Sequence, residues 1–131
     1  NSWVASFVGN PPMNLFEARV SGGNVVAKAG GVKVGVPPAY KDVVKEGQEV
    51  IAGFRPEDVK VGTGDVEGVV TMVERVGAYT VLHVDVNGLS LRLLQPSLST
   101  VSRGDRVRFE LPPEALSLFD PKTGLNLLRR G

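Results

Sequence analysis

Several kinds of protein chemistry are excluded by residues that this sequence lacks. None of its 131 residues is cysteine, which rules out disulfide bonds and thiolate chemistry. Only one histidine is present, His83, so a zinc site built from histidine and cysteine ligands is also excluded. No apolar run approaches the roughly 18 residues that a membrane-spanning helix needs. The chain must therefore act through some other arrangement of side chains.

The common catalytic and phosphate-binding motifs are missing as well. There is no GxxxxGK[ST] loop, and Gly62-Thr63-Gly64 is not followed by the third glycine of a dinucleotide-binding turn. A serine nucleophile would have to use His83, yet no GxSxG turn occurs. Fifteen basic and fourteen acidic residues give a net charge of +1, which is not the basic character expected of a nucleic-acid-binding domain. We therefore expect no enzyme activity from this chain.

What is present is enough apolar sequence for a folded domain. Hydrophobic residues make up 42% of the chain, which suffices for a core. The sequence starts at Asn1 rather than methionine, and Ser2 to Val8 is typical of the interior of a longer protein. We therefore expect the chain to be one part of a larger parent.

The first 13 residues differ in pattern from all that follow. Trp3 and Phe7 are four residues apart, which is the spacing of neighbours on one face of a helix. Gly9 and the pair Pro11-Pro12 would end such a helix. The pattern predicts a short tether helix and an extended linker over residues 1–13.

Beyond this segment the sequence is typical of β-structure. Leu82, Val84 and Val86 alternate with more polar residues, as expected for a strand with one buried face. Asn87-Gly88 follows, and then a second alternating run begins. An Asn-Gly pair between two such runs is a strong hairpin signal, because a type I′ turn needs positive φ at both positions.

A similar arrangement occurs earlier in the chain, at Gly30-Gly31. This pair lies 57 residues before Asn87-Gly88, and the same offset relates many other positions. It relates Val32, Val34, Val36, Gly47 and Val50 to Leu89, Leu91, Leu93, Gly104 and Val107, and Phe54, Pro56, Glu57, Val59 and Val61 to Leu111, Pro113, Glu114, Leu116 and Leu118. The constant offset predicts an internal pseudo-repeat.

We therefore predict an all-β fold in which two OB-like five-stranded barrels form residues 14–131. The half-repeats would be residues 14–62 and 65–131, joined near Gly62–Asp65. Neither half is expected to bury its apolar faces alone, so the two should pack together.

Few residues stand out as sites of chemistry. Glu57-Asp58 and Asp65-Val66-Glu67 have the composition of surface turns rather than of paired catalytic carboxylates. His83 falls on the strand face that carries Asp85, where a solvated histidine is expected. Arg55 is unmatched, because Pro112 takes its place in the second half. It either pairs locally at its corner or contacts another domain.

Four stretches of the sequence together resemble one protein family. They are FVGNPPMN (7–14), GFRPED (53–58), VERVGAYT (73–80) and LPPEALSLFDPKTG (111–124). They resemble the C-terminal regulatory domain of ATP-binding subunits of sugar-importing ABC transporters, of the maltose, trehalose and glycerol-phosphate type. In that family the domain is an OB-type, transport-associated module that follows the nucleotide-binding domain.

The resemblance implies a parent that lies at the inner face of the cell membrane, dimerises, hydrolyses ATP and docks on permease subunits. Its regulatory domains would contact each other across the dimer, and some relatives receive a regulatory protein of sugar uptake. ATP and magnesium would be bound by the missing domain, so this chain would hold no cofactor. The residues expected to contact the nucleotide-binding domain or the second subunit are Trp3, Phe7, Pro11, Pro12, Met13, Asn14, Arg55, Glu57 and Phe119.

A second interpretation, from a different functional class, stays open. OB-type barrels also bind small oxyanions and single-stranded nucleic acid. No constellation of Lys, Ser and Thr for an oxyanion stands out in the sequence, and the aromatic residues and basic groups do not cluster as a nucleic-acid platform requires. Titration with these ligands would distinguish the two interpretations.

Overall fold

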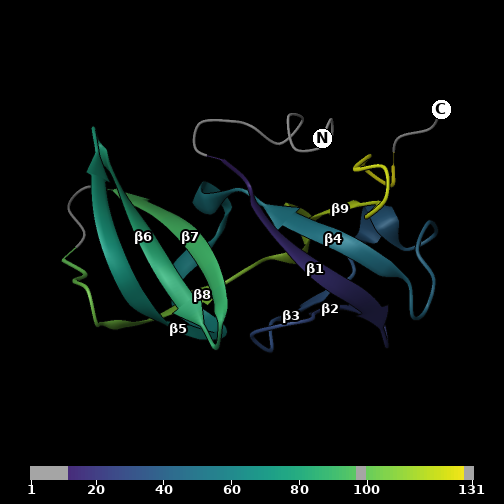
Figure 1. Cartoon of the computed structure of the whole chain (residues 1–131), viewed down its shortest axis with the longest axis horizontal. Coiled ribbons are helices and arrows are strands. Elements are labelled where there is room, and N and C mark those ends of the chain that lie inside the picture. Colours follow the sequence, from purple (N-terminus) through teal and green to yellow (C-terminus); the bar gives the residue numbers. More distant parts are fainter. Residues whose placement is uncertain (1–11, 97–99, 129–131) are drawn as a thin grey trace.

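The computed structural model describes residues 12–96 and 100–128, which form two antiparallel β-sheets (Figure 1). The first sheet has the strand order β3-β2-β1-β4-β9, with β1 Asn14–Ser21, β2 Asn24–Ala27, β3 Lys33–Gly35, β4 Glu49–Phe54 and β9 Ser117–Phe119. The second has the order β7-β6-β5-β8, with β5 Lys60–Val76, β6 Tyr79–Val86, β7 Leu89–Pro96 and β8 Arg106–Glu110. Three single 3-10 turns complete the elements, η1 Pro38–Tyr40, η2 Pro56–Asp58 and η3 Pro113–Ala115.

The all-β, OB-like fold predicted from the sequence is confirmed. Leu82, Val84 and Val86 of β6 are 0%, 1% and 2% exposed, as their alternation predicts. Residues of both sheets belong to one continuous apolar core, so the two halves do pack together. The predicted tether helix falls on residues 1–11, which lie outside the described part of the chain. Among the described residues, no helix is long and apolar enough to cross a membrane.

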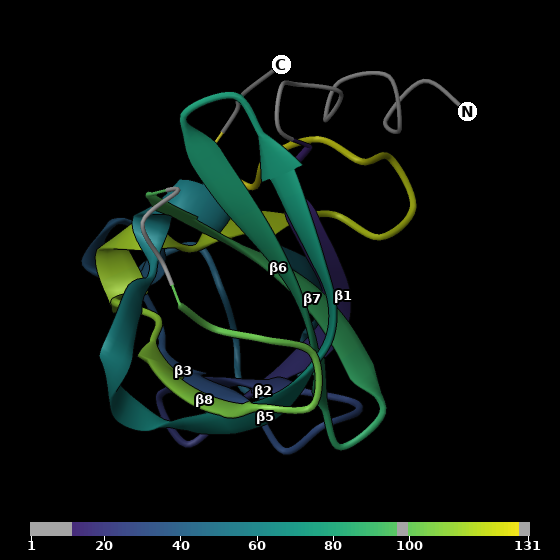
Figure 2. The same cartoon turned by 90° about the vertical axis from the view of Figure 1, so that its left-hand side faces the viewer.

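The second sheet has four strands rather than the expected five, because β5 pairs with β8 at two separate places. Lys60 and Val61 pair with Glu110 and Phe109, and Val66 pairs with Phe109 again. Between these two stretches β5 is irregular, and Gly62 and Gly64 have φ angles of 101° and 96° that favour glycine. Figure 2 shows β5 curving around this end of the molecule. The single strand β5 therefore takes the place of two separate strands in this sheet.

The sequence offset of 57 residues recurs in the structure. The turn η2 at residues 56–58 has its counterpart in η3 at residues 113–115, and β4 at residues 49–54 has its counterpart in β8 at residues 106–110. Each half also lends its last strand to the other. In the first sheet Ala52 pairs with Leu118, and the equivalent pair in the second sheet is Phe109 with Val61. Each sheet is thus completed by residues from the other half.

The two hairpin turns expected from glycine patterns are present, but they differ in length. Asn87-Gly88 is a two-residue turn between paired Val86 and Leu89, with φ angles of 49° and 96°. Gly30 and Gly31 also have positive φ, of 84° and 73°. They lie in a longer turn, because the N–H of Ala27 donates to the carbonyl of Val32 at 2.9 Å. The two turns meet where the halves join.

Candidate functional site

The predicted contact residues Met13 and Phe119 come together over Gly53 of β4. A Cβ placed on Gly53 would lie 2.7 Å from Met13 Sδ, 2.9 Å from Leu15 Cδ2 and 3.1 Å from Phe119 Cε2. Glycine lets these three side chains close over the strand, and a larger residue would require their ends to shift. Phe119 is 7% exposed and Met13 is half-buried. This apolar cluster joins the start of β1 to β9 at the C-terminal end of the fold.

Asn14, another predicted contact residue, connects the two sheets within this domain. Its side-chain Nδ2 donates to the Arg92 carbonyl at 2.8 Å, and its Oδ1 accepts from the Arg92 N–H at 2.8 Å. Arg92 belongs to β7, which is the edge strand of the second sheet. Asn14 is 4% exposed, so both hydrogen bonds are shielded from water. Its predicted contact with another domain stays a prediction.

The corner at Arg55-Pro56-Glu57 presents its charges to solvent. Pro56 is buried, whereas Arg55, Glu57 and Asp58 are exposed. The Arg55 carbonyl accepts the N–H of Asp58 at 3.0 Å, which closes the single turn η2. Among the described residues, Arg55 forms no ion pair. The proline anchors the corner, and the arginine side chain is left exposed beside it.

Glu57 and Pro12 line a groove that sequence reasoning did not identify. The opposite wall is the outer face of β5, β6 and β7, and the cavity has a volume of about 540 Å³. We call it the hairpin groove, and its lining residues are Pro12, Glu57, Glu74, Val76, Tyr79, Val81, Arg92 and Leu94. A signal in the sequence is the pair Val76 and Tyr79, two large apolar residues on either side of a glycine turn. In the structure they are 55% and 53% exposed.

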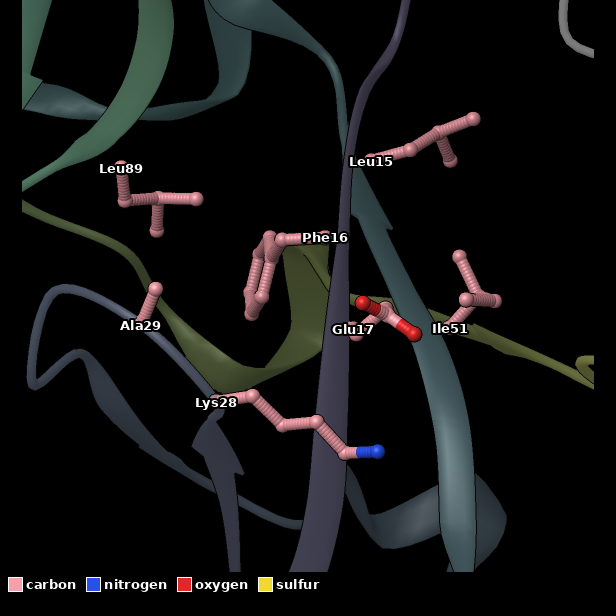
Figure 3. A pocket seen from close by; sticks show the side chains of 7 residues that line it. All are labelled: Leu15, Phe16, Glu17, Lys28, Ala29, Ile51 and Leu89. Carbon is pink, nitrogen blue, oxygen red and sulfur yellow. The ribbon is translucent and has the colours of Figure 1, made fainter.

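A second hollow of about 360 Å³ lies where the two halves meet (Figure 3). Figure 3 shows Phe16 pointing toward Leu89 and Ala29, with Leu15 and Ile51 on the other side of β1. Lys28 lines the hollow, and its ammonium is bound to the Glu49 carboxylate. Glu17 and Lys28 are the charged residues of its lining, and the other five lining residues are apolar.

Glu49 is the centre of a small charge cluster on the surface of the first sheet. Its carboxylate binds Lys28 and also accepts a hydrogen bond from Arg19 at 2.9 Å. These two hydrogen bonds, that from Lys28 above all, lower the pKa of Glu49 to about 2. Because the side chain remains 48% exposed, solvent screens the cluster and its contribution to stability is small.

The single histidine pairs with a glutamate of the neighbouring strand. His83 Nε2 lies 2.5 Å from Glu74 Oε1, and its side chain is 25% exposed. Within residues 12–96 and 100–128, no group of three or more His, Asp or Glu side chains is placed to hold a metal ion. The described surface therefore carries apolar clusters and grooves, which are suited to binding.

These features define a class of protein: a β-domain of two interlocked OB-type halves. A crystal structure of the cytoplasmic molybdate-binding protein ModG with molybdate bound has the same fold. The TM-score is 0.68 with 14% sequence identity, covering 80% of this chain and 94% of ModG. At this identity the likeness concerns the fold alone.

Sequence comparison identifies the family. The model described as MalK OB fold domain matches residues 9–59, and that described as TOBE domain matches residues 52–119. The chain belongs to this family of MalK-type OB and TOBE domains found in ATP-binding subunits of sugar ABC importers. The resemblance proposed from the four sequence stretches is thereby confirmed.

The relatives with curated names are ATP-binding proteins of importers. The glycerol-3-phosphate import protein UgpC of Ruegeria sp. is 35% identical over 93% of this chain and 34% of its own length. The alpha-glucoside transport protein AglK of Rhizobium meliloti is 35% identical over 92% and 35%. The trehalose/maltose import protein MalK of Thermococcus litoralis is 34% identical over 95% and 37%. The chain thus spans about a third of the length of these relatives.

Proposed function

We propose that this chain is the non-catalytic regulatory and dimerisation domain of the ATP-binding subunit of a carbohydrate-importing ABC transporter. The observation that carries the proposal is the alignment of three such subunits over 92–95% of the chain. ATP and magnesium would be bound by the nucleotide-binding domain, which the family places upstream. The chain itself would hold no cofactor.

Two features suit a rigid domain that acts through contacts with other domains rather than through catalysis. The shared core and the exchanged strands join both halves into one body. Asn14 fixes the first strand to β7 immediately after the Pro-Pro linker, so the point where the chain enters the domain is held firmly. Such a body would present a constant contact to a second copy while the nucleotide-binding domains separate, which raises their effective concentration.

The partners follow from this role. They would be the domain's own nucleotide-binding domain, a second ATP-binding subunit, and through the parent the permease subunits at the cytoplasmic face of the membrane. A regulatory protein of sugar uptake is a further candidate. The contact residues we propose are Pro12, Met13, Asn14, Arg55, Glu57 and Phe119, together with Trp3, Phe7 and Pro11 in the segment outside the described residues.

The experiment compares the parent subunit with and without this segment by analytical ultracentrifugation. We expect the truncated parent to have a lower dimer affinity than the full parent when no nucleotide is present. Unchanged dimer affinity would contradict the tether role. Titrating the isolated chain with molybdate, sulfate and single-stranded oligonucleotides is the matched control, because saturable binding of any of these would favour the ligand-binding interpretation.

A further inference from the structure

The hairpin groove combines an apolar floor with a half-exposed aromatic ring. Val81 is 9% exposed and Leu94 is half-buried, and the two are cross-strand partners between β6 and β7. Tyr79 and Val76 are partners at the tip of the β5–β6 hairpin, with about half of each side chain exposed. A flat ligand with an apolar face would bury this ring and floor together.

The polar groups of the groove carry both signs of charge. Glu57 and Glu74 line it with Arg92, and Glu74 is bonded to His83 at 2.5 Å. Among the described residues, neither the Glu57 carboxylate nor the Arg92 guanidinium forms an ion pair. The groove therefore offers unpaired acceptors and unpaired donors to whatever occupies it.

This mixture discriminates between ligand classes. An anion would satisfy only the guanidinium of Arg92, and a cation would satisfy only the carboxylates of Glu57 and Glu74. A hydroxyl group donates to a carboxylate and accepts from a guanidinium, so a neutral polyhydroxylated molecule satisfies both. The volume of about 540 Å³ lies within the usual range of small-ligand sites. We propose that the hairpin groove binds a neutral saccharide of one or two rings, with an apolar sugar face on Tyr79.

A bound saccharide would also join two parts of the fold. Pro12 immediately precedes β1, and Glu57 lies in the corner η2, whereas Tyr79 lies on the hairpin opposite. A ligand between them would fix the hairpin relative to the place where the chain enters the domain. That this ligand is the imported sugar, acting as feedback on its own uptake, rests on the proposed function.

The test is titration of the isotope-labelled whole chain with maltose, trehalose and glucose, followed by two-dimensional amide NMR. We expect saturable shifts confined to residues 74–81, 92–94 and 57, with a dissociation constant on the order of 1 mM. Tyr79→Ala should weaken binding about tenfold, which is the effect of losing roughly 1.4 kcal/mol of contact. Met72→Ala is the matched control, because Met72 is 46% exposed on the same hairpin and does not line the groove.

Each other outcome overturns the inference. The absence of saccharide-induced shifts would do so, and so would shifts that Tyr79→Ala leaves unchanged. Stronger binding of glycerol 3-phosphate or molybdate than of neutral sugars would show that charge, rather than hydroxyl groups, is recognised. None of these results affects the dimerisation test of the parent, so failure of this inference is distinguishable from failure of the proposed function.

Discussion

Asn87 donates its side-chain Nδ2 to the carbonyl of Gly30 at 3.5 Å, although the two residues are 57 positions apart in sequence. That separation is the repeat offset itself, so the two equivalent turns contact each other. A Cβ on Gly30 would lie 2.6 Å from the Val86 carbonyl oxygen and 2.8 Å from Leu89 Cβ. The two halves can approach this closely because Gly30 has no side chain.

Gly30→Ala should therefore destabilise the domain strongly. The substitution places a methyl group against backbone at a position where φ is +84°, and we expect a loss of about 3 kcal/mol. Gly31→Ala is the control, since φ is +73° but no atom lies within 4 Å. It should cost about 1 kcal/mol, the left-handed penalty alone. Urea denaturation followed by circular dichroism measures both, and equal losses would contradict the steric argument.

Asn14→Ala should also reduce the free energy of unfolding, by about 2 kcal/mol. The change removes the side chain that bonds both the N–H and the carbonyl of Arg92, and leaves these two part-buried backbone groups without that partner. Asn24→Ala is a matched control, because Asn24 makes only an exposed 3.3 Å bond to the Gly22 carbonyl. If the two variants unfold at the same urea concentration, Asn14 does not hold the sheets together.

The Glu49 cluster predicts a specific pH dependence. Because the folded-state pKa of Glu49 is about 2 and its ordinary value is 4.5, the unfolded chain binds the proton first as pH falls. The stabilisation is complete above pH 4.5 and is lost as pH falls toward about 2. Glu49→Gln should flatten the fall in melting temperature across this interval, while Glu114→Gln, an exposed carboxylate, should not. Parallel profiles for all three proteins would refute the assignment.

Arg55→Ala distinguishes a structural role of this side chain from a contact with another domain. Arg55 is exposed and Pro56 is the buried residue of the corner. The free energy of unfolding should therefore change by no more than about 0.5 kcal/mol, and the melting temperature should change little. In the parent, the same variant should alter the regulation of transport if Arg55 contacts another domain. Pro56→Ala is the reciprocal control, because it should destabilise the fold. If transport is regulated identically with and without the Arg55 side chain, the corner has only a structural role.

Much of the fold could be predicted from local patterns. Alternation identified the buried face of β6, and the Gly and Pro-Glu positions identified the repeat that η2 and η3 display. Pairing between distant segments could not be predicted in this way. Nothing near Ser117 indicates that β9 joins β4, and nothing near Asn14 indicates that its amide binds Arg92. Both depend on the relative placement of the halves, which a local pattern does not encode.

The hairpin groove was missed for a similar reason. Its walls come from Pro12, the η2 corner and three strands, which meet only in the folded chain. Tyr79 belonged to a stretch that was useful for recognising the family, yet its half-exposed ring is a property of the hairpin geometry. Arg92 alternates with the buried Leu91 and Leu93, a pattern that by itself indicates only a polar residue on the other face of a strand. A site assembled from well-separated segments leaves no compact motif.

The exchange of end strands also affects how the domain is made. β4 lacks its β9 partner until residues 117–119 have been synthesised, so the first sheet stays incomplete until almost the whole described chain exists. On a ribosome, the N-terminal half would wait with an open strand edge, a feature that invites aggregation. A product cut short before Ser117 would keep that edge exposed, giving chaperones and proteases a signal that separates unfinished subunits from finished ones.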